Sequence, residues 1–90
     1  MIKEETLEDR LNEAKDLSER EQEILFKSFK ERDNLLEEVR KIFKNNQKPD
    51  KVLLKKYKKI DKTIQGTQEN LRYLGDMQAF LEDEIEFSKY

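Results

Sequence analysis

The sequence predicts an all-α protein, built as an antiparallel two-helix hairpin with coiled-coil-like pairing. Its 90 residues include only two Gly and one Pro, which is typical of long uninterrupted helices. Apolar residues recur at spacings of three and four along both halves of the chain, as they do on one face of a helix. A single cluster of helix-breaking residues lies at the midpoint. We therefore expect one helical-hairpin domain over residues 1–90, with helices at 6–45 and 50–88 joined by a turn at 45–50.

The first predicted helix begins with a capping signal, because Asp9 follows Thr6 at the spacing of a capping box. Its apolar residues fill one arc about 140° wide at about 100° per residue. Leu7, Leu25 and Phe43 lie 18 residues apart, which is five turns of an unsupercoiled helix. The pattern thus favours a nearly straight helix over a tight coiled coil. The stripe comprises Leu7, Leu11, Ala14, Leu17, Ile24, Leu25, Phe29, Leu35, Leu36, Val39, Ile42 and Phe43.

Four polar residues, Ser18, Glu21, Ser28 and Arg32, interrupt this first stripe. A polar or charged residue inside a helix interface usually sets the register or finds a partner across the interface. We expect that role for these four side chains.

The turn is predicted from the residue types at 45–50. Asn tolerates the left-handed backbone that ends a helix, and Lys41 and Lys44 suit the negative end of the helix dipole. Pro49 fits the first turn of the following helix.

The second predicted helix carries a seven-residue repeat without a phase slip. Its members are Leu53, Tyr57, Ile60, Ile64, Thr67, Leu71, Leu74, Gln78, Leu81 and Ile85. The phase runs through Gly66 and Gly75, which favours one long helix, although each Gly costs about 1 kcal/mol against Ala. The alternative is a break at Gly66 with a new cap at Thr67, which would give three helices.

A second apolar stripe, Tyr73, Met77, Phe80 and Phe87, lies near the end of the second arm. It falls about 120° to 200° away from the Leu53 seam on a helical projection. We expect these side chains to face away from the first arm, where they would leave an exposed patch on the order of 500 Å². Burial in a homo-oligomer such as a dimeric four-helix bundle and docking of a different protein both fit this stripe.

Charge is divided along the chain. Residues 40–62 hold ten basic and two acidic residues, whereas the remainder holds nine basic and nineteen acidic residues. In a hairpin the turn end is then basic and the open end acidic. Lys51, Lys55, Lys58 and Lys62 step along the outer face of the second helix, and we call them the basic tip. A solvated face, docking to an acidic protein surface and weak binding of nucleic acid or anionic lipid are the three interpretations.

The composition excludes several kinds of chemistry. With no Cys and no His, the chain has no disulfide, no zinc site of the usual kind and no thiol or imidazole nucleophile. No phosphate loop or nucleophile elbow is present, and we expect no enzyme activity, no cofactor and no metal. No segment predicts a membrane span or a cleaved signal, so we expect a cytoplasmic protein.

By elimination, the sequence predicts a non-enzymatic protein–protein interaction module that uses the aromatic outer face of its second helix. An adaptor, a secretion-type chaperone and a small assembly subunit are the forms we expect. The alternatives are a homo-oligomeric structural subunit and a weak nucleic-acid binder. In length and central turn the chain looks like secretion and flagellar export chaperones, phage or bacterial adaptors and the WXG-type secreted hairpins. It lacks the Trp-x-Gly turn of the last class.

Overall fold

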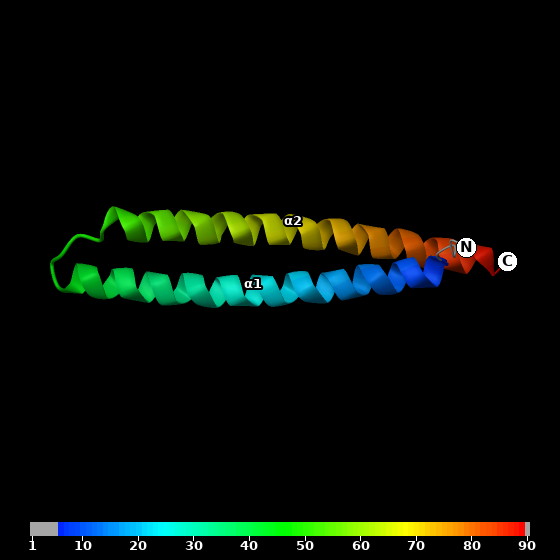
Figure 1. Ribbon diagram of the computed structural model, residues 1–90, viewed down its shortest axis with the longest axis horizontal. Helices are drawn as coiled ribbons and strands as arrows, with labels where there is room; N and C mark the ends of the chain where they lie inside the picture. The colour runs from blue at the N-terminus through cyan, green and yellow to red at the C-terminus, as the bar shows by residue number, and fades with distance from the viewer. Residues whose placement is uncertain (1–5, 90) are drawn as a thin grey trace, which may run out of the picture.

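Two long antiparallel helices make up the described part of the chain, residues 6–89 of a computed structural model. Helix α1 spans Leu7–Lys44 and helix α2 spans Lys51–Ser88. The helices run side by side from the turn, and both ends of the described chain lie at the opposite, open end (Figure 1). The predicted all-α hairpin is confirmed.

The ends of α1 follow the predicted capping chemistry. Thr6 accepts a hydrogen bond from the Asp9 amide at 3.1 Å, and the Asp9 carboxylate accepts one from the Thr6 amide at 3.3 Å. This capping box satisfies two amides that a helix start leaves unpaired. At the other end Lys41 and Lys44 lie in the last turn, where cations interact favourably with the helix dipole.

The turn needs one left-handed residue, Asn46, whose φ is 57°. The amides of Asn45 and Asn46 donate to carbonyls of the last turn of α1, which satisfies groups that a helix end leaves free. Asp50 then caps α2 by accepting a 3.4 Å hydrogen bond from the Val52 amide. Pro49 therefore precedes the cap, and its predicted place in the first turn of α2 is wrong. The carboxylate of Asp50 takes the capping role, and it shifts the helix start beyond Pro49.

Helix α2 continues without a break through Gly66 and Gly75. The three-helix alternative is therefore wrong. A Cβ added at either glycine would meet nothing within 4 Å, so close contact with α1 does not explain them.

Burial identifies the seam, by which we mean the positions where the two helices face each other. In α2 every member of the predicted seven-residue repeat is buried or half-buried. In α1 a seven-residue repeat also holds, with these members: Leu7, Leu11, Ala14, Ser18, Glu21, Leu25, Ser28, Arg32, Leu35, Val39 and Ile42.

The predicted straight-helix stripe of α1 is thus wrong in part. Four members of the predicted stripe are 40% to 59% exposed: Leu17, Ile24, Leu36 and Phe43. The polar residues that interrupt the stripe take their places in the seam. The partner helix explains which residues of α1 are buried. Helix α2 presents a seven-residue repeat, and two helices stay in contact along their length only when their repeats agree.

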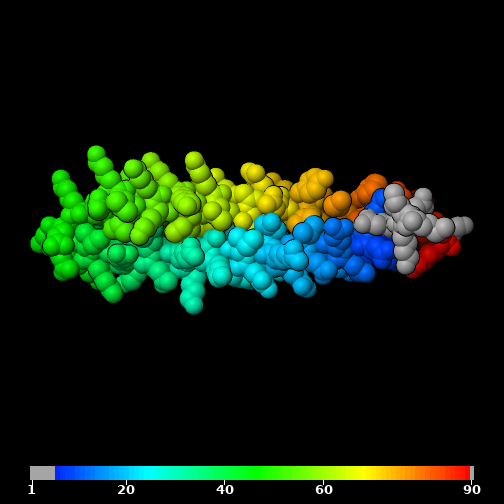
Figure 2. Space-filling model, in the orientation of Figure 1, coloured from blue at the N-terminus to red at the C-terminus, as the bar shows by residue number. Residues whose placement is uncertain are grey.

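The hairpin is a thin rod, with Cα extents of 68 × 28 × 14 Å (Figure 2). Among the described residues no side chain is less than 2% exposed. A layer of two helices leaves each seam residue one edge near water, so surface rather than interior dominates this molecule.

Candidate protein-binding surfaces

The seam contains four polar residues of α1 that we expected to set the register or to find a partner across the interface. One of them, Ser18, forms a hydrogen bond with α2. The Gln78 amide donates a 2.6 Å hydrogen bond to the Ser18 hydroxyl, which links α2 to α1. Ser28 is buried, 6% exposed, and contributes a small side chain to the seam. Arg32 instead lies over the ring of Phe29 in its own helix, 5.0 Å from the ring centre. The Ser18–Gln78 bond forms in this antiparallel register and therefore favours it.

Three large aromatic side chains form the surface that we call the aromatic surface: Tyr73, Phe80 and Phe87. They are 68%, 63% and 81% exposed. Their spacing of seven residues places them in one column on α2, with successive rings about 10 Å apart along the helix. None of them belongs to the seam, so α1 does not cover them.

Met77 departs from the predicted stripe. It is 41% exposed and, with Ala14 and Leu17 of α1, lines an open hollow of about 430 Å³. The prediction that all four side chains face away from the first arm is therefore wrong for Met77. Met77 directly precedes the seam residue Gln78, so its long side chain borders α1.

The four lysines of the basic tip, Lys51, Lys55, Lys58 and Lys62, are all exposed. Long side chains stand out from the outer side of the first half of α2 in Figure 2. The basic tip and the aromatic surface thus occupy opposite halves of one helix, both on its outer side.

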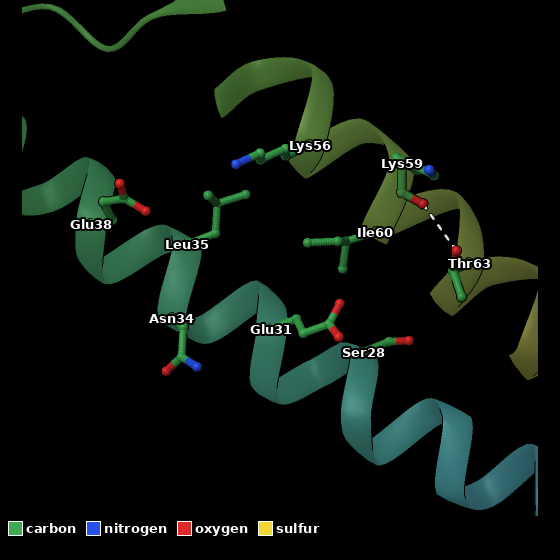
Figure 3. Close-up of a pocket in the computed structure, with 9 residues that line it drawn as sticks. All are labelled: Ser28, Glu31, Asn34, Leu35, Glu38, Lys56, Lys59, Ile60 and Thr63. Atoms are coloured by element: carbon green, nitrogen blue, oxygen red, sulfur yellow. Dashed lines mark hydrogen bonds between the residues drawn. The ribbon is translucent and has the colours of Figure 1, made fainter. Parts of the chain in front are cut away.

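A second hollow, of about 480 Å³, lies between the helices (Figure 3). Glu31 and Glu38 of α1 border it on one side, and Lys56 and Lys59 of α2 border it on the other. Opposite charges therefore flank this side of the seam, which favours the observed pairing of the helices. The hollow is an open trough whose floor includes Leu35 from the seam.

An apolar groove that the sequence did not predict lies beside the turn, and we call it the tip groove. It has a volume of about 380 Å³, and Leu36, Phe43, Pro49, Leu54 and Tyr57 contribute to its walls. A signal was present, since Leu36, Phe43 and Leu54 each directly follow a seam residue. In an antiparallel pair such positions from both helices lie along the same side. The straight-helix interpretation concealed this signal.

Two properties of residues 6–89 bear on other functions. Neither helix contains a stretch that is both long and apolar enough to cross a membrane. Over the same residues, no three Asp or Glu side chains come together in an arrangement that could hold a metal ion.

Comparison of the chain with protein-family models, with curated proteins and with solved structures finds no match.

Proposed function

We propose that the protein is a non-enzymatic assembly module, a rigid hairpin that binds another polypeptide chain through the aromatic surface of α2. An adaptor, a secretion-type chaperone and a small assembly subunit all belong to this class. The hairpin then serves as a spacer that holds the aromatic surface away from the turn.

The exposure of Tyr73, Phe80 and Phe87 carries this proposal. Aromatic side chains supply much of the binding energy at protein interfaces, because each removes a large apolar area from water without losing many rotamers. Scattered single apolar residues on a surface are ordinary, but three exposed rings aligned in one column of a thin rod form a row of aromatic anchors. That arrangement supports binding of a chain that lies along α2.

A pull-down from the source cell tests the proposal. Wild-type protein is compared with the Phe80→Glu/Phe87→Glu variant, in which two charges are placed on the aromatic surface. We expect a polypeptide, a second copy included, to be retained by the wild type and lost from the variant.

Phe26 provides a matched control, because it is 70% exposed but lies on α1. The Phe26→Glu variant should retain the same polypeptide as the wild type. Equal retention by all three proteins, or retention by none, would refute the proposal, provided that circular dichroism shows the same helix content in each.

A further inference from the structure

We propose that the chain which covers the aromatic surface is a second copy of this protein, lying antiparallel to the first along α2. This inference rests on the proposed function and names the occupant of the same surface. It comes from a self-complementary order of side chains on the outer side of α2.

The column that holds the aromatic surface also holds Val52, Lys59 and Gly66, at the same spacing of seven residues. When two copies of α2 run antiparallel with their centre between residues 69 and 70, residue i of one copy lies level with residue 139 − i of the other. Each large ring then lies level with a residue that can accommodate it.

Three contacts follow in that central column. Phe87 lies level with Val52, which is 53% exposed, so two apolar side chains cover each other. Phe80 lies level with Lys59, whose aliphatic stem can cover the ring while its ammonium stays in water. Tyr73 lies level with Gly66, where nothing occupies the space that a Cβ would fill.

The columns on both sides of the aromatic column place opposite charges near the same level, except at the centre, where the exposed Glu69 lies within one residue of the level of its own copy. On one side Lys55 lies within one residue of the level of Asp83, and Lys62 lies within one residue of the level of Asp76. All four side chains are exposed in the hairpin. Two-fold symmetry produces each pair twice.

On the other side Lys56 lies within one residue of the level of Glu84, and both side chains are exposed. In a parallel arrangement the two flanking columns would face each other at the same level, which would place Lys55 beside Lys56 of the second copy and Asp83 beside its Glu84. Like charges that face each other oppose association. The division of charge along α2 therefore favours the antiparallel orientation.

The area is of the right order for a dimer. The six rings of two copies would remove roughly 800 Å² from water, given ~200 Å² for each aromatic side chain and the exposed fractions above. Lysine stems and Val52 add to that area along about 50 Å of paired helix. A stable protein interface buries about 1,200 to 2,000 Å² in total.

Cysteine cross-linking of the purified protein tests the orientation, because the natural chain has no Cys. Asn70 is exposed and lies in the Lys56 column, level within one residue of its own copy. We expect Asn70→Cys to form a disulfide-linked dimer under mild oxidation, with the wild-type helix content in circular dichroism.

Thr63→Cys and Met77→Cys are the matched controls in the same column. In the antiparallel dimer each lies about 20 Å from its own copy, too far for a disulfide, but the two lie opposite each other. Each variant alone should stay unlinked, and their mixture should cross-link. Self-linking of Thr63→Cys as efficiently as Asn70→Cys would overturn the antiparallel arrangement.

Light scattering on charge variants supplies a second readout. Lys62→Glu should raise the dimer dissociation constant about tenfold, because it creates two like-charge pairs with Asp76. An equimolar mixture of Lys62→Glu with Asp76→Lys should restore wild-type association. Lys58→Glu has the same net charge but lies outside the three columns, so its association should equal that of the wild type.

Failure of this inference is distinct from failure of the proposed function. A wild-type protein that is monomeric at 100 µM and forms no Asn70→Cys dimer overturns the second copy as occupant. If the pull-down still retains a different polypeptide through Phe80 and Phe87, the proposed function stands without this inference. If neither experiment detects a bound chain, both are wrong.

Discussion

At the level of single residues, one backbone conformation closes the hairpin. Asn46 has a φ of 57°, in the left-handed region that costs most residues about 1–2 kcal/mol. Asn tolerates this region better than other non-glycine residues, because its short side-chain amide can form hydrogen bonds with the nearby backbone. The choice of residue at position 46 therefore affects how readily the chain turns.

Substitution of Asn46 tests this point. Asn46→Ala should lower the free energy of unfolding by about 1 kcal/mol, because Ala bears the full steric cost of the left-handed region. Asn46→Gly should leave it equal or slightly higher, because Gly has no Cβ. Urea unfolding at one fixed protein concentration measures both. Equal losses in the two variants would contradict the explanation.

The polar pair in the seam gives a second prediction at this scale. Ser18→Ala leaves the half-buried Gln78 amide without its 2.6 Å acceptor and should lower the free energy of unfolding by about 1 kcal/mol. Replacing both partners, as Ser18→Leu/Gln78→Leu, should raise it, because no polar group is then left unpaired. Thermal unfolding followed by circular dichroism compares the three proteins. A double variant that is less stable than Ser18→Ala would contradict this account.

At the level of the helices, the sequence predicted α2 better than α1 for a physical reason. The seam of α2 is mostly apolar, so its seven-residue repeat is visible in hydropathy alone. In α1 the pairs Leu17 and Ser18, or Ile24 and Leu25, offer neighbouring positions, and apolarity favours the wrong member of the first pair. Only the partner helix decides, because the repeat of α2 and the Gln78 hydrogen bond draw Ser18 into the seam.

The sequence also predicted the surface on α2 better than the surface that involves α1. The outward position of Tyr73, Phe80 and Phe87 follows from the correct repeat of α2. The tip groove depends on which residues of α1 flank the seam, so the straight-helix interpretation could not reveal it. Met77 was predicted to face away from α1 because a helical projection gives only the direction of each side chain. It does not account for the length that lets the Met77 side chain border α1.

A helix-level prediction concerns Gly75, which lies within continuous helix and where an added Cβ would meet nothing within 4 Å. Gly75→Ala should raise the free energy of unfolding by up to about 1 kcal/mol, because Ala loses less conformational freedom in a helix. Chemical denaturation at low protein concentration measures the change. No gain, or a loss, would show that α2 needs flexibility or a hidden contact at this position.

At the level of the whole molecule, charge is polarised from the basic turn end to the acidic open end. The residues outside 40–62 carry an excess of ten negative charges, whereas residues 40–62 carry an excess of eight positive charges. This distribution opposes a nucleic acid that would extend beyond the basic tip, since its phosphates would meet carboxylates. It equally favours an antiparallel second copy.

Titration with labelled DNA and RNA tests this balance. We expect no binding at about 50 mM salt, because lysines on one helix grip phosphates weakly and the acidic half repels them. Binding at about 50 mM that falls steeply by about 200 mM would instead support the nucleic-acid alternative. Lys55→Glu/Lys62→Glu would then identify the surface, since loss of these charges would abolish that binding.

The thinness of the rod has a consequence for how it opens. Each part of the hairpin contacts only the parts next to it along the rod. The two helices can therefore begin to separate at the open end while the turn stays folded. Backbone amides near Phe87 should therefore exchange with solvent sooner than those near Tyr57. A chain that binds the aromatic surface would hold together the end that opens first. Binding at that one end should therefore slow backbone amide exchange along the entire rod.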